Sequence, residues 1–99
     1  MNGALDGKVA IVTGGGRGIG RGIAREFAAN GARVVVNDAG LTLAGESEGL
    51  SPATEVVSQI EALGGQAAAV TESVSTFEGG QRIVQAALDT FGRLDIVVT

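Results

Sequence analysis

The stretch VTGGGRGIG, residues 12–20, contains a Thr followed by five glycines in seven positions. It begins inside the apolar, β-branched run KVAIVT (8–13), which predicts a strand that is covered on both faces. It ends inside residues 18–30, where apolar residues recur every fourth position, as in a helix with one buried face. The sequence therefore predicts a glycine-rich loop between the carboxyl end of a strand and the first turn of a helix.

These glycines suit the binding of a phosphate at the start of the helix. A helix N-terminus presents unpaired N–H groups and a partial positive charge, and a phosphate binds there when no side chain keeps it from the backbone. We expect Gly14 to turn the chain out of the strand, Gly18 to expose the backbone to a pyrophosphate, and Gly20 to let the helix pack closely on the sheet. The other members of the loop are Thr13, Gly15, Gly16 and Arg17.

The spacing of the loop excludes two familiar glycine motifs. The phosphate loop of NTPases requires Lys and then Ser or Thr after its last glycine, where this chain has Arg21 and Gly22. The strict dinucleotide motif G-x-G-x-x-G would place its last glycine at Ile19 or Arg21. The pattern that fits is T-G-x-x-x-G-x-G.

Strands and helices alternate along the rest of the chain. Residues 39–50, AGLTLAGESEGL, form a long connection that is either a lid or a solvated excursion. The alanines of QAAAVT favour a helix, but the brevity of this run after two glycines favours a strand. The further strands expected are RVVVND (33–38), QAAAVT (66–71) and LDIVVT (94–99). Two further helices are expected: one from Pro52 to Leu63, with Ser51 as its N-cap, and one over residues 76–91.

Each predicted helix has a stripe of apolar residues that we expect to face the sheet. The stripes are Ile19, Ile23 and Phe27 in the first helix; Ala53, Val56, Val57, Ile60 and Leu63 in the second; and Ile83, Val84, Ala87, Leu88 and Phe91 in the third. Such an alternation implies parallel strands joined by right-handed crossovers. The predicted fold is therefore α/β, the first half of a Rossmann-type doubly wound parallel sheet with strand order 3-2-1-4 and a ligand crevice between strands 1 and 4.

Composition narrows the classes of function. The chain has 99 residues, a net charge of −4 and its basic residues scattered singly, which disfavours nucleic acid as a partner. It has no Cys and no His, so no metal site is expected. No apolar run is long enough to span a membrane, and the first residues lack the apolar core of a signal peptide. The cytoplasm is the expected compartment.

Asp38, at the end of the second predicted strand, is the acidic residue expected about twenty positions beyond a dinucleotide-binding glycine loop. Its carboxylate can accept both hydroxyl groups of the adenosine ribose. A 2′-phosphate would meet a like charge there, and no Arg or Lys follows Asp38 to offset it. Arg17 is the one feature that favours NADP. We therefore expect NAD as the cofactor in preference to NADP.

Three motifs together resemble the short-chain dehydrogenase/reductase family over the whole chain. They are LDGKVAIVTGGGRGIG (5–20), Asp38 within VVVND, and FGRLDIVVT (91–99). The resemblance implies that Gly14, Gly18, Ile19 and Gly20 cradle the pyrophosphate and that Asp38 holds the ribose. It also implies that the segment after the third strand, Glu72, Ser73 and Val74, contacts the adenine. Many members of the family have Asp where this chain has Glu72, so backbone contacts from Ser73 and Val74 are favoured over a side-chain contact.

The resemblance further implies hydride transfer between nicotinamide and an alcohol or ketone, commonly by a tetramer or dimer. Catalysis in the family uses a Ser, a Tyr and a Lys four residues after the Tyr. This chain has no Tyr, and its only lysine is Lys8, ahead of the first strand. We therefore expect no catalytic residue in residues 1–99, which would form the N-terminal dinucleotide-binding part of one larger Rossmann domain. The alternatives are a nucleotide-binding module without chemistry and, less in keeping with the loop, an S-adenosylmethionine-dependent methyltransferase.

Overall fold

The computed structural model describes residues 3–14, 16, 18–38 and 52–99. In these residues strands and helices alternate from the first element to the last. The order is β1 (Val9–Thr13), α1 (Gly18–Ala29), β2 (Arg33–Asn37), α2 (Pro52–Ala62), β3 (Gln66–Val70), α3 (Phe77–Phe91) and β4 (Ile96–Val98). None of the helices in the described ranges is long and apolar enough to cross a membrane. The predicted connection 39–50 and the predicted N-cap Ser51 lie outside the described residues.

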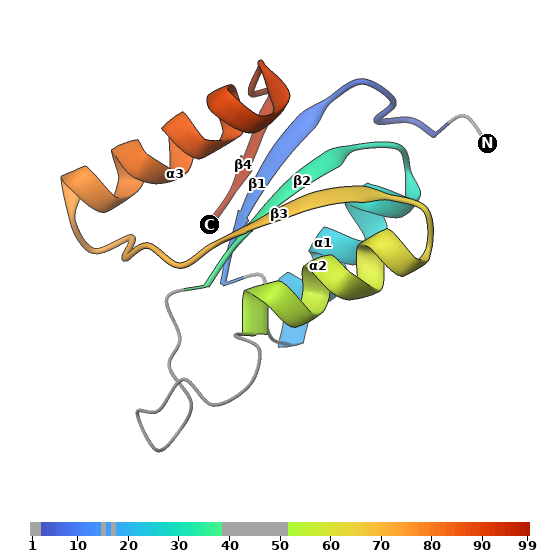
Figure 1. The fold of residues 1–99 in the computed structure, drawn as a ribbon, viewed down its shortest axis with the longest axis horizontal. Helices are drawn as coiled ribbons and strands as arrows, with labels where there is room; N and C mark the ends of the chain where they lie inside the picture. Colours follow the sequence, from blue (N-terminus) through green and yellow to red (C-terminus); the bar gives the residue numbers. More distant parts are fainter. Residues whose placement is uncertain (1–2, 15, 17, 39–51) are drawn as a thin grey trace.

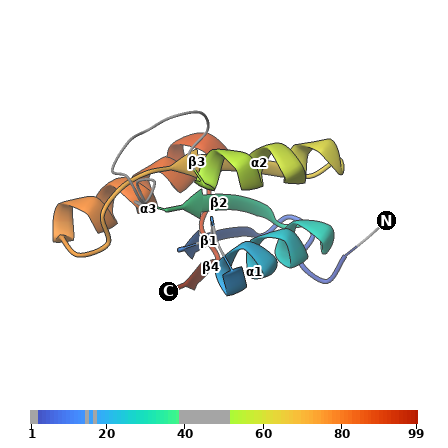
Figure 2. The same ribbon diagram turned by 90° about the horizontal axis from the view of Figure 1, so that it is seen from below.

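The four strands form one sheet in the order β3-β2-β1-β4, as Figure 2 shows. All three pairings are parallel, with Ile11 of β1 opposite Val35 of β2 and Val97 of β4. Helices α1 and α2 cover one face of the sheet and α3 covers the other (Figure 1). The predicted strand order and the strand at QAAAV are thus both confirmed.

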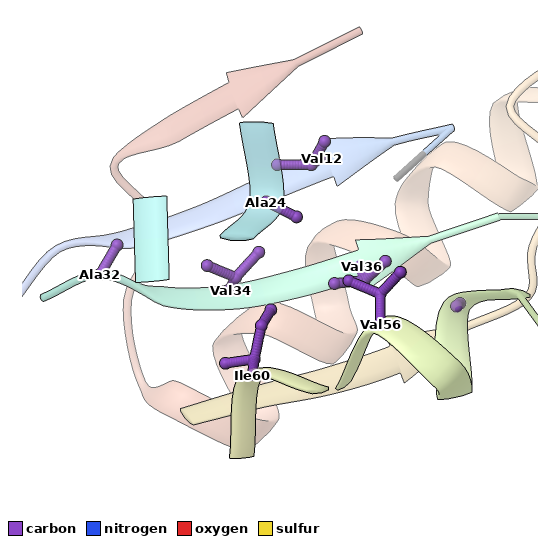
Figure 3. Packing of buried hydrophobic residues seen from close by; sticks show 8 residues of the cluster. Val12, Ala24, Ala32, Val34, Val36, Val56 and Ile60 are labelled. Carbon is purple, nitrogen blue, oxygen red and sulfur yellow. The ribbon is translucent and has the colours of Figure 1, made fainter. Parts of the chain in front are cut away.

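The main core lies between the sheet and the helices α1 and α2. Val12, Val34 and Val36 point from β1 and β2 into this layer, where they meet Ala24 of α1 and Val56 and Ile60 of α2 (Figure 3). The alternate strand residues Val9, Ile11 and Val35 pack on the other face against Ile83 and Ala87 of α3. Because successive strand residues point to opposite faces, burial on both faces requires the continuous apolar runs seen in β1 and β2.

The expected apolar stripes are wrong at four positions. Ile19 is 84% exposed because it lies in the first turn of α1, whereas the buried contact of this helix with the sheet is made further along, at Ala24. Leu63 is 76% exposed because α2 ends at Ala62 and the chain turns at Gly64. Val84 and Leu88 are partly exposed, since each lies one residue, about 100° around the helix, beyond the buried Ile83 and Ala87.

Asp95 joins the start of β4 to the start of β1. Its backbone N–H donates to the carbonyl oxygen of Val9 at 2.9 Å, and its Oδ2 accepts from the N–H of Val9 at 2.9 Å. Arg93 donates to both carboxylate oxygens, at 2.9 and 2.7 Å. The Arg93 guanidinium and then the Val9 N–H hold the pKa of Asp95 at about 2, below its ordinary 3.8. Asp95 therefore aligns the amino ends of two neighbouring strands.

We expect this contact to contribute stability that depends on pH. Since the pKa of Asp95 is lower in the folded chain, its contribution is complete above about pH 4 and is lost as the pH falls towards about 2. The free energies of unfolding of wild type and Asp95→Asn, measured from pH 7 to pH 2, should differ by a constant amount above about pH 4 and converge below it. Asp89→Asn, the same change on the exposed side of α3, is the control. A difference that stayed constant down to pH 2 would contradict the role given to Asp95.

Candidate dinucleotide-binding site

The glycine loop lies at the carboxyl end of the sheet, between β1 and α1. At this end β1 is flanked by β2 and β4. The helix that follows β1, α1, lies on one face of the sheet, and the helix that precedes β4, α3, lies on the other (Figure 1). The hydroxyl of Thr13 donates to the carbonyl oxygen of Val98 at 3.2 Å and so joins the ends of β1 and β4. A reversal of strand order of this kind is where open parallel sheets bind ligands.

Two glycines of the loop have backbone conformations that other residues rarely adopt. Gly14 has φ of 66° and Gly18 has φ of 51°, both in the left-handed region. A Cβ built at either position would have no neighbour within 4 Å among the described residues. The backbone is therefore open towards these residues at Gly14, where the chain leaves the strand, and at Gly18, the first residue of α1, where a phosphate would need to approach.

Gly16 brings the loop into contact with Asp38. The Gly16 N–H donates to Oδ2 of Asp38 at 3.2 Å, and this hydrogen bond is buried. Asp38 is only 9% exposed, and its backbone N–H extends the pairing of β2 by donating to the Val70 carbonyl oxygen at 3.0 Å. The carboxylate is therefore held beside the glycine loop at the end of β2. The sequence predicted both residues in the site but not the hydrogen bond between them.

We expect Gly16→Ala to disturb this contact. The added Cβ would lie 2.7 Å from Oδ2 of Asp38 and 2.6 and 2.8 Å from Cβ and C of Pro52, at the start of α2. Because backbone atoms of Pro52 must move, we expect the free energy of unfolding to fall by about 1–3 kcal/mol. The affinity of the full-length protein for NADH should fall by about tenfold, as measured by titration.

Gly22→Ala is the matched control for Gly16→Ala. In the part of the chain that the structure describes, a Cβ at Gly22, within α1, has no neighbour within 4 Å, so this change should raise the free energy of unfolding by up to about 1 kcal/mol through helix propensity. If the two variants showed the same free energy of unfolding and the same affinity for NADH, the close contact of Gly16 with Asp38 and Pro52 would contribute to neither property.

The expected adenine segment follows β3 and runs towards α3. The Glu72 carboxylate accepts from Arg82 Nη1 of α3 at 3.2 Å, which engages this side chain in an ion pair. The Ser73 hydroxyl lies 2.6 Å from that of Ser75 and accepts from the Ser75 N–H. Val74 is exposed. The side chains of Glu72 and Ser73 are thus engaged within the chain, which favours the backbone of this segment as the part that meets a ligand.

Asn37 is a site residue that the sequence analysis missed. It is 1% exposed, its Nδ2 donates to the Glu72 carbonyl oxygen at 3.1 Å, and its Oδ1 accepts from the Glu72 N–H at 3.0 Å. The available signal was the amide itself, because a polar residue at an inward position of an otherwise apolar strand must find partners there. Asn37 fixes the segment after β3 to the end of β2.

The structure brings most of the predicted site residues to one end of the sheet. Arg17, with its neighbour Gly15, lies outside the described residues. Gly16 of the glycine loop lies beside Asp38, and Glu72, in the segment after β3, lies beside Asn37. The predicted residues placed here are Gly14, Gly16, Gly18, Ile19, Gly20, Asp38, Glu72, Ser73 and Val74.

A family model described as short chain dehydrogenase matches residues 8–99. The chain belongs to the short-chain dehydrogenase family. Among curated relatives, mouse peroxisomal multifunctional enzyme type 2 is 50% identical over 94 residues, which is 95% of this chain and 12% of that relative. Peroxisomal multifunctional enzyme A of Dictyostelium discoideum is 50% identical over 91 residues, 92% of this chain and 20% of that relative. The stretch VVVNDAG (34–40) and the long connection after it also indicate similarity to the type 2 enzyme.

Solved structures of short-chain dehydrogenases share the fold. One from Mycobacterium avium superposes with a TM-score of 0.88 at 49% identity, covering 96% of this chain and 33% of that one. A 7α-hydroxysteroid dehydrogenase complexed with NADH and 7-oxo glycochenodeoxycholic acid has a TM-score of 0.82 at 39% identity, covering 94% and 33%. The chain therefore spans about a third of these family members, the part that holds the glycine loop.

Proposed function

We propose that this chain is the cofactor-binding part of an NAD-dependent oxidoreductase that transfers hydride between nicotinamide and an alcohol or ketone. The observation that carries the proposal is the Asp38 carboxylate, 9% exposed and held beside the glycine loop by the Gly16 N–H. A carboxylate fixed at the end of the second strand is suited to accept the hydroxyl groups of an adenosine ribose.

The described residues fit a dinucleotide. Gly14 at the strand exit and Gly18 at the first turn of α1 leave space among the described residues, and the unpaired N–H groups of that turn suit a pyrophosphate. Asp38 would hold the ribose, and the backbone of Ser73 and Val74 would face the adenine. The nicotinamide supplies the redox chemistry when the cofactor is bound, while this chain binds and orients it.

The same carboxylate favours NAD over NADP. A 2′-phosphate placed about 4 Å from Asp38 would meet a repulsion of roughly 1 kcal/mol in water and about 4 kcal/mol at an effective dielectric constant of 20. The 7α-hydroxysteroid dehydrogenase that shares the fold was solved in complex with NADH. Arg17 in the loop is the residue that would reduce the preference if it reached the 2′-phosphate.

The rest of the enzyme is proposed from the family. Residues 1–99 would be the N-terminal part of one Rossmann domain, with the catalytic Ser, Tyr and Lys in its continuation and a dimer or tetramer as the assembly. The cytoplasm stays the predicted compartment, whereas the names of the mouse and Dictyostelium relatives place those proteins in peroxisomes. Localisation of a fluorescent fusion of the full-length protein distinguishes the two compartments.

Turnover assays test whether this chain binds the cofactor while its continuation supplies the catalytic residues. The 99 residues contain no Tyr, and Lys8 lies ahead of β1, so this chain by itself should not reduce carbonyl compounds with NADH. The full-length protein, assayed by NADH absorbance against a panel of ketones and secondary alcohols, should turn over at least one of them. NADH binding without turnover by the full-length protein on any member of the panel would instead favour the nucleotide-binding module.

A further inference from the structure

We propose that Asn37 is a positioning residue that fixes the adenine-binding wall of the site and so sets the selectivity for the base of the cofactor. This inference rests on the proposed function and deepens it. Asn37 itself is buried and would not touch the cofactor. It would act through the backbone of Glu72, which precedes Ser73 and Val74.

The side chain of Asn37 replaces a piece of β-sheet backbone. The register of β2 and β3 ends with Asn37 opposite Val70, and the Asp38 N–H adds one more hydrogen bond, to the Val70 carbonyl oxygen. Beyond that point the Asn37 amide takes over, donating to the carbonyl oxygen of Glu72 and accepting from its N–H at 3.1 and 3.0 Å. The segment after β3 is thereby held two residues further than the strand pairing reaches.

The same segment is held on its other side by α3. A Cβ at Gly79 would lie 1.8 Å from the carbonyl oxygen of Ser73, so the first turn of α3 approaches the segment as closely as a glycine allows. The Thr76 hydroxyl caps this turn by accepting from the Gly79 N–H at 2.9 Å. Glu72 and Ser73 therefore lie between a buried amide and a helix terminus, which contact their backbone from two sides.

Asn37 also connects the two halves of the adenosine site. Its neighbour in the chain is Asp38, the proposed ribose ligand, which Gly16 holds from the loop. Through Asn37, the backbone expected to face the base is fixed relative to the carboxylate expected to face the ribose. A base that exchanges a donor for an acceptor at the edge facing this backbone would leave a polar group unpaired, and such a mismatch is a strong source of discrimination.

The test compares NADH with reduced nicotinamide hypoxanthine dinucleotide, in which an oxo group replaces the 6-amino group of the adenine. In the full-length wild type we expect NADH to bind at least about tenfold more tightly than the hypoxanthine analogue. In Asn37→Ala this ratio should fall towards one, while Kd for NADH rises by about tenfold. Asn30→Ala is the matched control, because the Asn30 amide donates to the carbonyl oxygen of Glu26, in α1, in an exposed hydrogen bond. It should leave the ratio unchanged.

Two further measurements test the role of Asn37 if the Asn37→Ala variant folds poorly. Asn37→Asp retains an acceptor for the Glu72 N–H but loses the amide donor, and it should lower the ratio as well. Hydrogen exchange of the wild type should show a protected Glu72 amide, and rapid exchange of this amide would overturn the inference.

The outcomes separate this inference from the proposed function. A wild type that binds neither dinucleotide contradicts the proposed function and, with it, the role of Asn37. A wild type that binds both equally, or an Asn37→Ala variant that loses affinity for both by the same factor, contradicts the positioning role alone. A selective loss of the preference for adenine supports it.

Discussion

In the Asp38→Asn variant of the full-length protein, NADPH should bind about tenfold more tightly than in the wild type, while NADH binds more weakly. The carboxylate would repel a 2′-phosphate, and the neutral amide would not. NADH would lose affinity because an amide has one acceptor oxygen where the carboxylate has two. Titration of both cofactors, followed by nicotinamide fluorescence, measures the two effects together.

Asn is a sharper substitution here than Ala because Asp38 also holds the glycine loop. Its Oδ2 accepts the buried hydrogen bond from Gly16, and an Asn oxygen can still accept it. Asp38→Ala removes the charge and this hydrogen bond together. The protein should therefore bind both cofactors more weakly, and the difference between its affinities for NADH and NADPH should become smaller. Asp89→Asn makes the same change of charge on the exposed side of α3, where Asp89 accepts from Gln85, and should leave the difference between the two affinities unchanged. If Asp38→Asn left the ratio of the two affinities as it was, Asp38 would not be the residue that selects the cofactor.

Gly79→Ala should lower the free energy of unfolding by about 3 kcal/mol. The new methyl group would lie 1.8 Å from the Ser73 carbonyl oxygen and 2.9 Å from Oγ1 of Thr76, the N-cap of α3. The first of these is a backbone atom, so the segment after β3 and the helix must separate. Helix propensity favours Ala over Gly by only about 1 kcal/mol, which is too little to offset the overlap.

Gly80→Ala is the control for this prediction and should have the opposite sign. A Cβ at Gly80 has no neighbour within 4 Å in residues 3–14, 16, 18–38 and 52–99, so helix propensity decides the sign, and the free energy of unfolding should rise by up to about 1 kcal/mol. Urea unfolding measures the free energy of unfolding of both variants and of the wild type. Because Ser73 belongs to the proposed adenine wall, Gly79→Ala should also weaken NADH binding. Two adjacent variants that were both more stable than the wild type would show that α3 does not approach Ser73 as described.

The order and identity of the elements were predictable because each follows from local patterns. The continuous apolar runs of β1 and β2 require burial on both faces, and the glycines after them mark the turns. Parallel strands with right-handed crossovers then leave few possible strand orders. The strand at QAAAV was predictable from its brevity and place, although its alanines favour a helix.

The contacts between distant segments were less predictable. The hydrogen bond from Gly16 to Asp38 spans 22 positions, and that from Asn37 to Glu72 spans 35, and no local period marks either partner. Nothing in the sequence distinguishes Gly79 from its neighbour Gly80, whereas in the structure the missing side chain of Gly79 admits the Ser73 carbonyl oxygen. Apolar spacing also overstated burial at Ile19 and Leu63, because a helical stripe says nothing of where the covering sheet ends.

The proposal that this chain binds NAD through Asp38 is tested most directly by the affinities of the full-length wild-type protein for NADH and NADPH. Measured in the same buffer and at the same ionic strength, Kd for NADH should be lower by about tenfold or more, as expected for a like charge beside a 2′-phosphate. Equal affinities, or tighter binding of NADPH, would contradict the account of the site.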